Sequence, residues 1–146
     1  MSSCNKKIKE YIANSPSAIL ATVDSENNPN LRAIGGYGVD EFTVYFSTAK
    51  KSNKVKQIEE NNNISLLFQH ENQKMPNFIN VEIKGIAENL EDEEAFNEGF
   101  KFIAERRPKL KASKETHNIY KITPKQIKVL DFSKENPDEK IRIIEV

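Results

Sequence analysis

Cysteine and long hydrophobic runs are nearly absent from this chain of 146 residues. Its single cysteine, Cys4, excludes a disulfide bond within one chain and a metal cluster built from the cysteines of one chain. No apolar run approaches the roughly 20 residues that a membrane span needs. The N-terminal segment MSSCNKKIKEYI also lacks the apolar centre of a signal peptide. We therefore expect no membrane partner and a cytoplasmic location.

A net charge is missing as well. Lys+Arg and Asp+Glu both total 22, so the formal charge at pH 7 is zero. Proteins that bind nucleic acids or anionic membranes usually carry a basic excess or stripe, so neither partner is expected. The chain has two histidines, His70 and His117, and their spacing is not that of a metal site. We expect both histidines at surface or capping positions and predict no metal site.

No repeat, low-complexity tract or linker interrupts the chain, so residues 1–146 are expected to form one domain. Alternating apolar residues predict strands, and apolar residues at helical spacing predict helices. The predicted strands are residues 17–23, 30–34, 42–47, 64–68, 79–84, 86–90, 118–123, 126–132 and 141–146, with a glycine break at 35–38, a bulge at Gly85 and a hinge at Thr123–Pro124. The predicted helices are residues 6–13, a short one from Ser52, and 92–107. We predict an α+β fold, mainly β, with an antiparallel barrel or curled sheet of about six or seven strands and flanking helices.

The short helix from Ser52 carries its charges against the helix dipole. In the stretch STAKKSNKVKQIEE, Lys54 and Lys56 open the helix and Glu59 and Glu60 close it, whereas the dipole favours acids first and bases last. An anion at the N-terminus would remove this cost, because free backbone N–H groups, Ser52 and Lys54 would bind it together. The alternative is a solvated lysine face, in which Lys56 pairs with Glu59 or Glu60.

An arginine within a predicted strand bears on this choice. Arg32 stands between Leu31 and Ala33. If the strands curl so that Arg32 lies beside Thr48 and Ser52, one phosphate would receive a guanidinium, an ammonium, two hydroxyls and a helix N-terminus. On an edge strand the same arginine would be a surface residue, and the spacing alone leaves both arrangements open.

Several short motifs follow one another in an order and spacing that are more specific than any one of them. They are ATVD and PNLR (residues 21–32), VYFST, SNKV and Ile58 (44–58), NISLLF (63–68), VEIKGIAE (81–88) and YKITP (120–124). In these motifs the chain resembles the pyridoxamine 5'-phosphate oxidase-like family over about residues 17–132. The resemblance implies an FMN-binding split β-barrel, usually a homodimer with the flavin at the subunit interface.

The resemblance also implies which residues bind the cofactor. Arg32, Ser52 and Lys54 would hold the FMN phosphate with Thr48 nearby, residues 33–35 would run under the flavin ring, and Asn80 would contact the flavin through its amide. The implied cofactor-binding set is Arg32, Ala33, Ile34, Gly35, Ser47, Thr48, Ser52, Asn53, Lys54 and Asn80. No catalytic residue is assigned, because a flavin supplies the redox chemistry itself.

Departures from the family pattern narrow the expected function. Asn53 stands where the oxidases tend to have a second basic residue, and the chain shows neither their C-terminal substrate-binding segment nor residues for a second phosphate. We therefore expect an FMN-dependent oxidoreductase for another small organic substrate, of the short stress-protein or nitroimidazole-reductase type, with a nicotinamide nucleotide as the candidate electron donor. The alternatives are a non-enzymatic flavin-binding or redox stress-response module, or a barrel that holds a deazaflavin or haem. The lack of a well-placed ligand histidine argues against haem.

Overall fold

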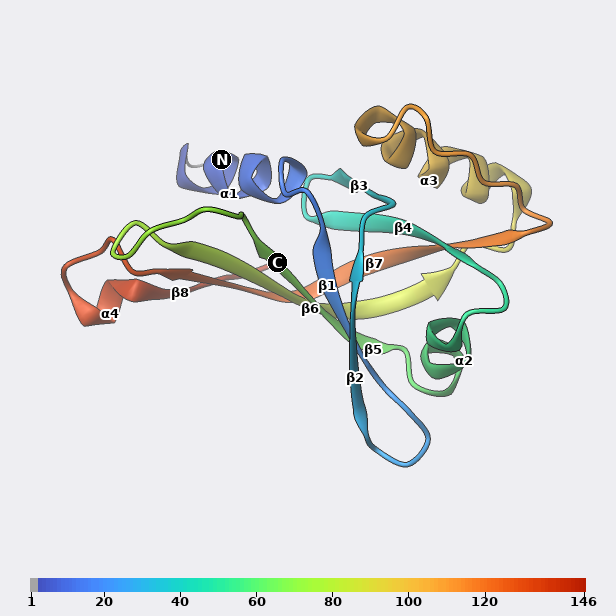
Figure 1. The fold of residues 1–146 in the computed structure, drawn as a ribbon, viewed down its shortest axis with the longest axis horizontal. Coiled ribbons are helices and arrows are strands. Elements are labelled where there is room, and N and C mark those ends of the chain that lie inside the picture. The colour runs from blue at the N-terminus through green and yellow to red at the C-terminus, as the bar shows by residue number, and fades with distance from the viewer. Residues whose placement is uncertain (1–2) are drawn as a thin grey trace.

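Eight strands follow the alternating apolar segments of the chain and join in one antiparallel sheet (Figure 1). The computed structural model describes residues 3–146. The strands are β1 (Ala18–Val23), β2 (Pro29–Ile34), β3 (Tyr37–Asp40), β4 (Thr43–Ala49), β5 (Asn63–Gln69), β6 (Ile79–Asn89), β7 (His117–Asp131) and β8 (Ile141–Ile144). The helices are α1 (Ser3–Ala13), α2 (Asn53–Glu60), α3 (Glu93–Arg106) and α4 (Pro137–Lys140).

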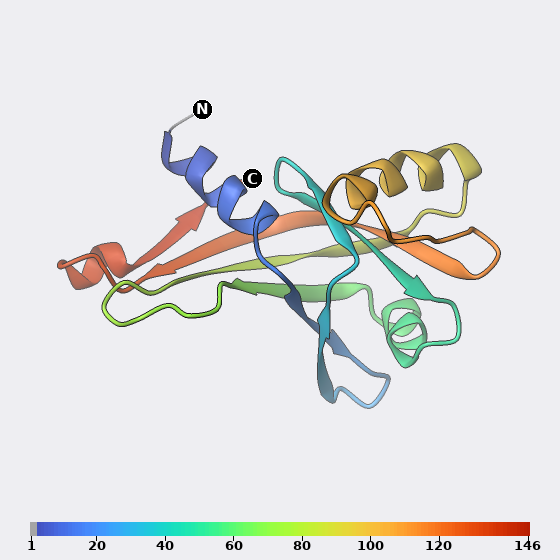
Figure 2. The same cartoon turned by 45° about the horizontal axis from the view of Figure 1, so that its top comes forward.

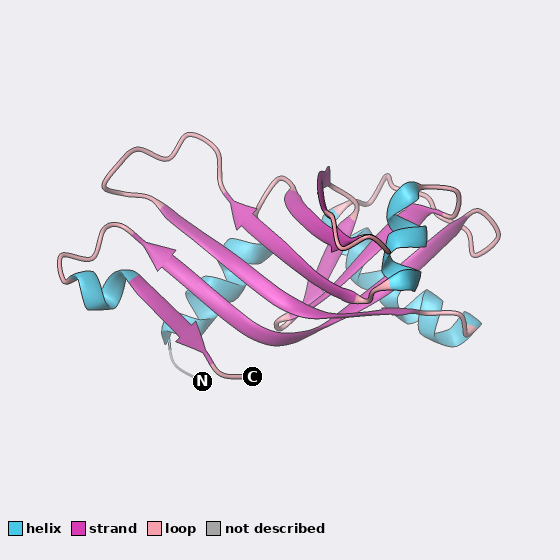
Figure 3. Ribbon diagram, turned by 90° about the horizontal axis from the view of Figure 1, so that it is seen from below, coloured by secondary structure: helices cyan, strands magenta, loops and turns pink. Residues whose placement is uncertain are grey.

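The order of the strands makes the sheet a split barrel. It runs β2-β1-β5-β6-β7-β4-β3, and β8 pairs with β7 outside this path. Strand β7 is long enough to pair with β4 along its first half and with β8 along its second half. The strands lie obliquely beside one another in a curled sheet, with helices at its margins (Figure 3). The predicted α+β fold, mainly β, with an antiparallel split barrel is therefore confirmed.

The predicted hinge at Thr123–Pro124 is wrong, because β7 continues through it as one strand of 15 residues. Pro124 lies opposite Gly85 of β6, where the pairing register shifts between Lys84 and Gly85. The predicted bulge at Gly85 is thus present. A Cβ atom on Gly85 would lie 2.5 Å from the Thr123 carbonyl oxygen, so glycine permits the close approach of the two strands. The irregularity accommodates the proline, which cannot donate a ladder hydrogen bond.

The predicted glycine break at residues 35–38 is too long. Only Gly35 and Gly36 lie outside the strands, and Tyr37 starts β3, which pairs with β4. Gly38 is a residue of β3 rather than part of a break. It is glycine because α3 crosses directly over it, and a Cβ atom there would lie 2.1 Å from the Phe102 carbonyl oxygen. This extra strand brings the total to eight, where about six or seven were expected.

Two hydrophobic clusters stabilise the sheet. The larger lies inside the curl and includes Ile12 of α1 and Phe46 of β4. The smaller lies under α3, which packs across β3 and β4 (Figure 2), and buries Phe96, Ile103 and Tyr45. The alternation of β4 therefore places apolar side chains in both clusters rather than leaving one face polar. The predicted apolar stripe of α3 is confirmed, with Phe96 and Ile103 buried and Phe100 packed against them.

The helices predicted from Ser52 and from residue 92 each begin one residue later, whereas α1 begins at Ser3 rather than at residue 6 and α4 was not predicted. Asp92 caps α3 by accepting a hydrogen bond from the Ala95 amide, and Ser52 stands at the N-cap of α2. The longest of the described helices, α3, has 14 residues. None of the helices in the described part of the chain is both long and apolar enough to cross a membrane.

Candidate functional site

A cavity of about 340 Å³ opens where the ends of β2 and β4 meet the start of β7. Its wall is completed by Lys54 of α2 and by the segment that follows α3. The lining residues are Ala33, Ile34, Gly35, Gly36, Ser47, Thr48, Ala49, Lys54, Leu110, Lys111 and His117. Six of these lining residues belong to the predicted cofactor set: Ala33, Ile34, Gly35, Ser47, Thr48 and Lys54. The curl of the sheet thus brings together residues from three separate motifs of the sequence.

Lys54 stands in the first turn of α2 and is the charged member of the predicted set that reaches the cavity wall. Among the described residues its ammonium group has no ion pair within 4 Å and no hydrogen bond. Burial lowers the pKa of Lys54, and the neighbouring Arg32 guanidinium lowers it further. Two cations are therefore held close together with no carboxylate between them.

Arg32 lies behind Lys54 rather than in the cavity wall. Its guanidinium donates to the hydroxyl of Thr22 at 2.7 Å and to the side-chain oxygen of Gln57 at 2.7 Å. Thr22 in turn donates to the same Gln57 oxygen at 2.6 Å. Burial lowers the pKa of Arg32, and its partners in this network are neutral. The arginine therefore adds its charge to the site while its position is fixed from β1 and α2.

The N-terminus of α2 has no side-chain cap. The Ser52 side chain makes no capping bond to the helix; instead its hydroxyl lies 3.0 Å from the Thr48 hydroxyl. The first turn of the helix carries no acidic residue. Uncapped backbone N–H groups, two hydroxyls and an ammonium group therefore converge at one helix N-terminus, which is the arrangement that binds phosphate groups.

The glycine segment in the cavity wall is held from outside by the end of α3. The Arg107 Nε atom donates to the Gly35 carbonyl oxygen at 3.1 Å, and Arg107 also bonds to the carbonyl oxygen of Pro16. The Ser47 amide donates to the Gly36 carbonyl oxygen at 3.0 Å. A trans peptide directs its C=O and N–H to opposite sides, so anchoring the Gly35 carbonyl turns the Gly36 N–H away from Arg107. No acceptor for that N–H is found among the described residues.

Five wall residues were not part of the predicted set: Gly36 and Ala49, which adjoin predicted residues, and Leu110, Lys111 and His117, which come from later segments. Leu110 and Lys111 come from the segment after α3, where no sequence motif marks them. His117, expected at a surface or capping position, pairs with Ala49 across β7 and β4 and lines the cavity. Its Nδ1 atom lies 2.7 Å from the Thr116 hydroxyl. The strand register alone brings His117 to the site, and the register was not predictable from the spacing.

Four predicted residues do not line the cavity of the same chain. Arg32 and Ser52 make the contacts described above, and Asn53 and Asn80 lie elsewhere. Asn53 lines a different cavity on the surface, together with Asp24, Lys56 and Gln57. Asn80 lies on β6, where its amide nitrogen is 3.4 Å from the Gln69 side-chain oxygen. Their roles toward a cofactor stay predictions. Within residues 3–146, no group of three or more histidine, cysteine, aspartate or glutamate side chains is placed to hold a metal ion.

Comparison with known proteins was made for both sequence and fold. The family model described as pyridoxamine 5'-phosphate oxidase matches residues 4–131. A search of curated protein sequences finds no match to the chain.

Solved structures with similar folds include three from different bacteria. General Stress Protein 26 of Bacillus anthracis has a TM-score of 0.71 and 20% identity, covering 99% of this chain and 100% of its own. A NimC/NimA family protein of Clostridium acetobutylicum has a TM-score of 0.70 and 14% identity, covering 95% and 91%. A heme binding protein of Mycobacterium smegmatis has a TM-score of 0.74 and 12% identity, covering 99% of this chain and 59% of its own. At these identities the likeness establishes the fold alone.

Proposed function

The chain belongs to the pyridoxamine 5'-phosphate oxidase family, and from that premise we propose that it is an FMN-dependent oxidoreductase acting on a small organic molecule. Oxidation of pyridoxamine phosphate itself is not proposed. A reduced nicotinamide nucleotide is the class of electron donor that we propose.

The observation that carries this proposal is the uncompensated positive charge at the start of α2. Burial lowers the pKa of both Lys54 and Arg32, and the Arg32 guanidinium lowers the pKa of Lys54 further, so an anion bound beside these cations would be stabilised. The Thr48 and Ser52 hydroxyls and the helix amides supply neutral donors at the same point. The phosphate group of FMN fits this donor set, and hydrogen bonds to charged groups contribute about 1.5–3 kcal/mol each.

The rest of the cavity wall suits the flavin ring. Residues 33–36 present backbone groups there, and the free Gly36 N–H is a donor for a polar ring edge. When bound, FMN would supply hydride or electron transfer. The chain's part is to hold the phosphate at Lys54, to orient the ring against the glycine segment and to limit the access of water.

A second copy of the chain is part of the proposal. The cavity is open to solvent, and Asn80 lies opposite Leu130, near the end of β7 away from His117, so it does not reach the cavity within one chain. In a homodimer with the flavin at the interface, Asn80 of one subunit would contact the flavin held by the other. This arrangement reconciles the assignment of Asn80 with its position on the sheet.

Titration with FMN tests the proposal. We expect bound FMN to show flavin absorbance and quenched fluorescence, and Lys54→Ala to weaken its affinity by about tenfold to a hundredfold through the loss of one charged contact. Lys56→Ala is the matched control, since Lys56 belongs to the same helix but lines the separate cavity beside Asn53 and Gln57. Failure of the folded protein to bind FMN, or equal affinity in Lys54→Ala and Lys56→Ala, would contradict it.

Turnover separates an enzyme from a flavin-binding module. With a reduced nicotinamide nucleotide and a nitroaromatic or quinone acceptor, an oxidoreductase consumes many equivalents of reductant per bound flavin. A carrier or redox stress-response module consumes one equivalent and stops. The second outcome would leave FMN binding intact and replace the proposed catalysis with the non-enzymatic alternative.

Haem is a second candidate group, because His117 lines the cavity. Imidazole is a common axial ligand of haem iron, and one structure of similar fold is a heme binding protein. Since Nδ1 of His117 lies beside the Thr116 hydroxyl, Nε2 is the nitrogen left for a ligand. A Soret band on addition of haem, abolished in His117→Ala while FMN affinity is unchanged, would favour this candidate.

A further inference from the structure

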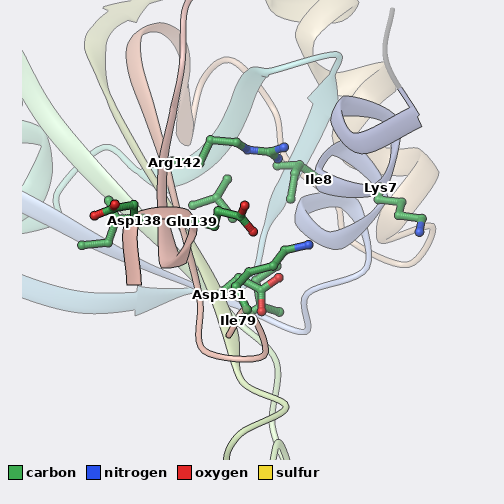
Figure 4. A pocket seen from close by; sticks show the side chains of 10 residues that line it. Lys7, Ile8, Ile79, Asp131, Asp138, Glu139 and Arg142 are labelled. Carbon is green, nitrogen blue, oxygen red and sulfur yellow. The ribbon is translucent and has the colours of Figure 1, made fainter. Parts of the chain in front are cut away.

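A second cavity, of about 480 Å³, lies at the other end of β7 from the cofactor cavity. The cofactor cavity includes His117 at the start of this strand, and the second cavity includes Val129 and Asp131 at its end. Helix α1, helix α4 and strand β8 complete its wall (Figure 4). The two cavities share no lining residue, so the second one is a separate site.

The floor of the second cavity is apolar. Ile8 of α1 and Val129 of β7 are 5% and 3% exposed, and Ile79 packs beside them. Ile141 of β8 also lines the cavity and is 56% exposed, which is unusual for a large apolar side chain. A ligand with an apolar portion would cover this surface.

Charged side chains of both signs surround the floor and are not paired with one another. The bases are Lys7, Lys134 and Arg142, and the acids are Asp131, Asp138 and Glu139. The ion pairs found in the described chain are Lys9–Glu41 and Lys128–Glu82, which lie elsewhere. Acidic and basic side chains therefore line the same cavity without forming ion pairs with one another.

The groups that face the hollow come from three elements. In Figure 4 the Arg142 side chain extends from β8 toward Ile8, and the carboxylates of Glu139 and Asp131 lie on the opposite side of the same space. One Asp131 oxygen already accepts hydrogen bonds from the Ser133 amide and hydroxyl, which fixes the carboxylate and leaves its second oxygen for a ligand. Asp138 points away from the space in this view.

We propose that this second cavity binds a zwitterionic ligand with an apolar side chain, namely a free α-amino acid of the leucine or phenylalanine kind. The Arg142 guanidinium binds the ligand carboxylate in its planar fork, the Glu139 and Asp131 carboxylates accept from the ligand ammonium, and the side chain lies on Ile8 and Val129. A purely anionic or cationic ligand would leave one set of wall charges unpaired.

The contrast with the cofactor cavity supports this choice of ligand. There, Lys54 and Lys111 line the wall with no acid among the lining residues, which favours an anion. Here, acidic and basic side chains both line the wall around an apolar floor. The proposal does not depend on FMN, so its outcome is independent of the proposed function.

Isothermal titration calorimetry of the full chain with L-leucine and L-phenylalanine tests the proposal. Two half-ligands serve as probes: 4-methylpentanoate, which lacks the ammonium group, and 3-methylbutylamine, which lacks the carboxylate. We expect each to bind about tenfold more weakly than L-leucine, the loss that follows from one charged hydrogen bond. Glycine, which lacks the side chain, is also expected to bind more weakly.

Substitutions locate the site. Arg142→Gln and Glu139→Gln should each weaken L-leucine binding by about tenfold, whereas Glu135→Gln, a matched exposed acid outside the cavity, should not. Circular dichroism and thermal unfolding check that the variants keep their fold. Absence of binding at millimolar amino acid, equal binding of the half-ligands, or unchanged affinity in both Arg142→Gln and Glu139→Gln would overturn the proposal.

Discussion

At the scale of one residue, Lys54 is a proposed binding group whose charge lowers the stability of the folded chain. Burial and the Arg32 guanidinium both lower its pKa, so its charged form is less favourable in the folded chain than in the unfolded chain. A group with a lowered cationic pKa destabilises the folded state wherever it is protonated in both states. Lys54 is partly exposed, and solvent screening keeps this cost modest.

We predict that Lys54→Met raises the thermal midpoint of the cofactor-free protein slightly and weakens FMN binding at the same time. The methionine retains the apolar stem of lysine and removes the repulsion from Arg32. Differential scanning calorimetry with and without FMN measures both effects. A lower midpoint for Lys54→Met without cofactor would contradict this account of the charge.

The same argument sets a pH dependence. At neutral pH, Lys54 is protonated in both the folded and unfolded states, so the stability difference between the wild type and Lys54→Met is fully present. As the pH rises through the lowered folded-state pKa toward the ordinary lysine value, folded Lys54 loses its proton first and the difference shrinks. Chemical denaturation at a series of alkaline pH values follows this change.

At the scale of elements, two glycines in neighbouring segments have different reasons to be glycine. Gly38 lies under α3, where an added Cβ atom would meet the backbone of Phe102 at 2.1 Å and of Ile103 at 2.4 Å. Gly35 lines the cofactor cavity, and a Cβ atom there would meet nothing within 4 Å. Neither glycine has a positive φ, so backbone conformation does not demand glycine at either position.

We therefore predict opposite outcomes for the same substitution. Gly38→Ala forces α3 from β3 and should reduce the free energy of unfolding by about 3 kcal/mol, the upper part of the range for overpacking. Gly35→Ala should leave stability nearly unchanged but narrow the cavity and weaken FMN binding. Urea denaturation and FMN titration of both variants make the comparison, and equal losses of stability would contradict it.

The arginines at the end of α3 join elements that are distant in the sequence. Arg106 donates to the carbonyl oxygens of Ala13, Ser15 and Tyr37, and its guanidinium lies 3.6 Å from the centre of the Tyr37 ring. Both arginines reach the Gly35 carbonyl oxygen in the cavity wall, Arg107 at 3.1 Å and Arg106 at 3.5 Å. Arg106 therefore fixes α1 against β3, and Arg107 makes the shorter hydrogen bond to the glycine segment.

We predict that Arg106→Ala lowers the free energy of unfolding by about 3 kcal/mol, because it removes several charge-assisted hydrogen bonds and a cation–π contact. Arg107→Ala should cost less stability but should weaken FMN binding and speed hydrogen exchange at the Ser47 amide, which donates to the Gly36 carbonyl oxygen. Exchange mass spectrometry and FMN titration measure these two effects. Unaltered exchange at the Ser47 amide of Arg107→Ala would show that Arg107 does not position the glycine segment.

At the scale of the whole molecule, the proposed homodimer links assembly to cofactor binding. If each flavin contacts both subunits, FMN must tighten the dimer by the same factor by which dimerisation tightens FMN binding. Under this proposal, Asn80, which lies outside the cavity of its own chain, would complete the site of the other subunit.

We predict a mass of about twice the 16.7 kDa of one chain in analytical ultracentrifugation, with a dimer that FMN strengthens. Asn80→Ala should weaken FMN binding, whereas Asn97→Ala, an exposed asparagine on α3, should not. A monomer that binds FMN at full affinity would exclude a site shared between subunits.

The local elements of this protein could be read from its sequence because their signals are local. The period of two in β4 and β5, the start of α2 after Ser52, and the bulge at Gly85 each depend on neighbouring residues, and the structure agrees with them. The reversed charges of α2 also marked the start of that helix as unusual before any fold was known. The predicted site residues at the ends of two strands and the start of α2 came from short motifs of this kind together with the family resemblance.

The tertiary structure determined strand continuity, strand register and the lining of the cavity, which the spacing of residues in the sequence does not predict. The predicted hinge at Thr123–Pro124 is instead part of a continuous β7, because the bulge in β6 accommodates the proline. Tyr37 is a strand residue rather than part of the predicted glycine break, because it pairs with β4 and α3 packs over this strand. The register of β7 against β4 brought His117 into the cavity, and the path after α3 brought Lys111 there. A strand's partner and register depend on contacts far along the chain, whereas periodicity, capping and turn chemistry depend on residues within one or two turns. The sequence by itself therefore determined the elements and the unusual charge of α2, and only the folded sheet determined which side chains share a cavity.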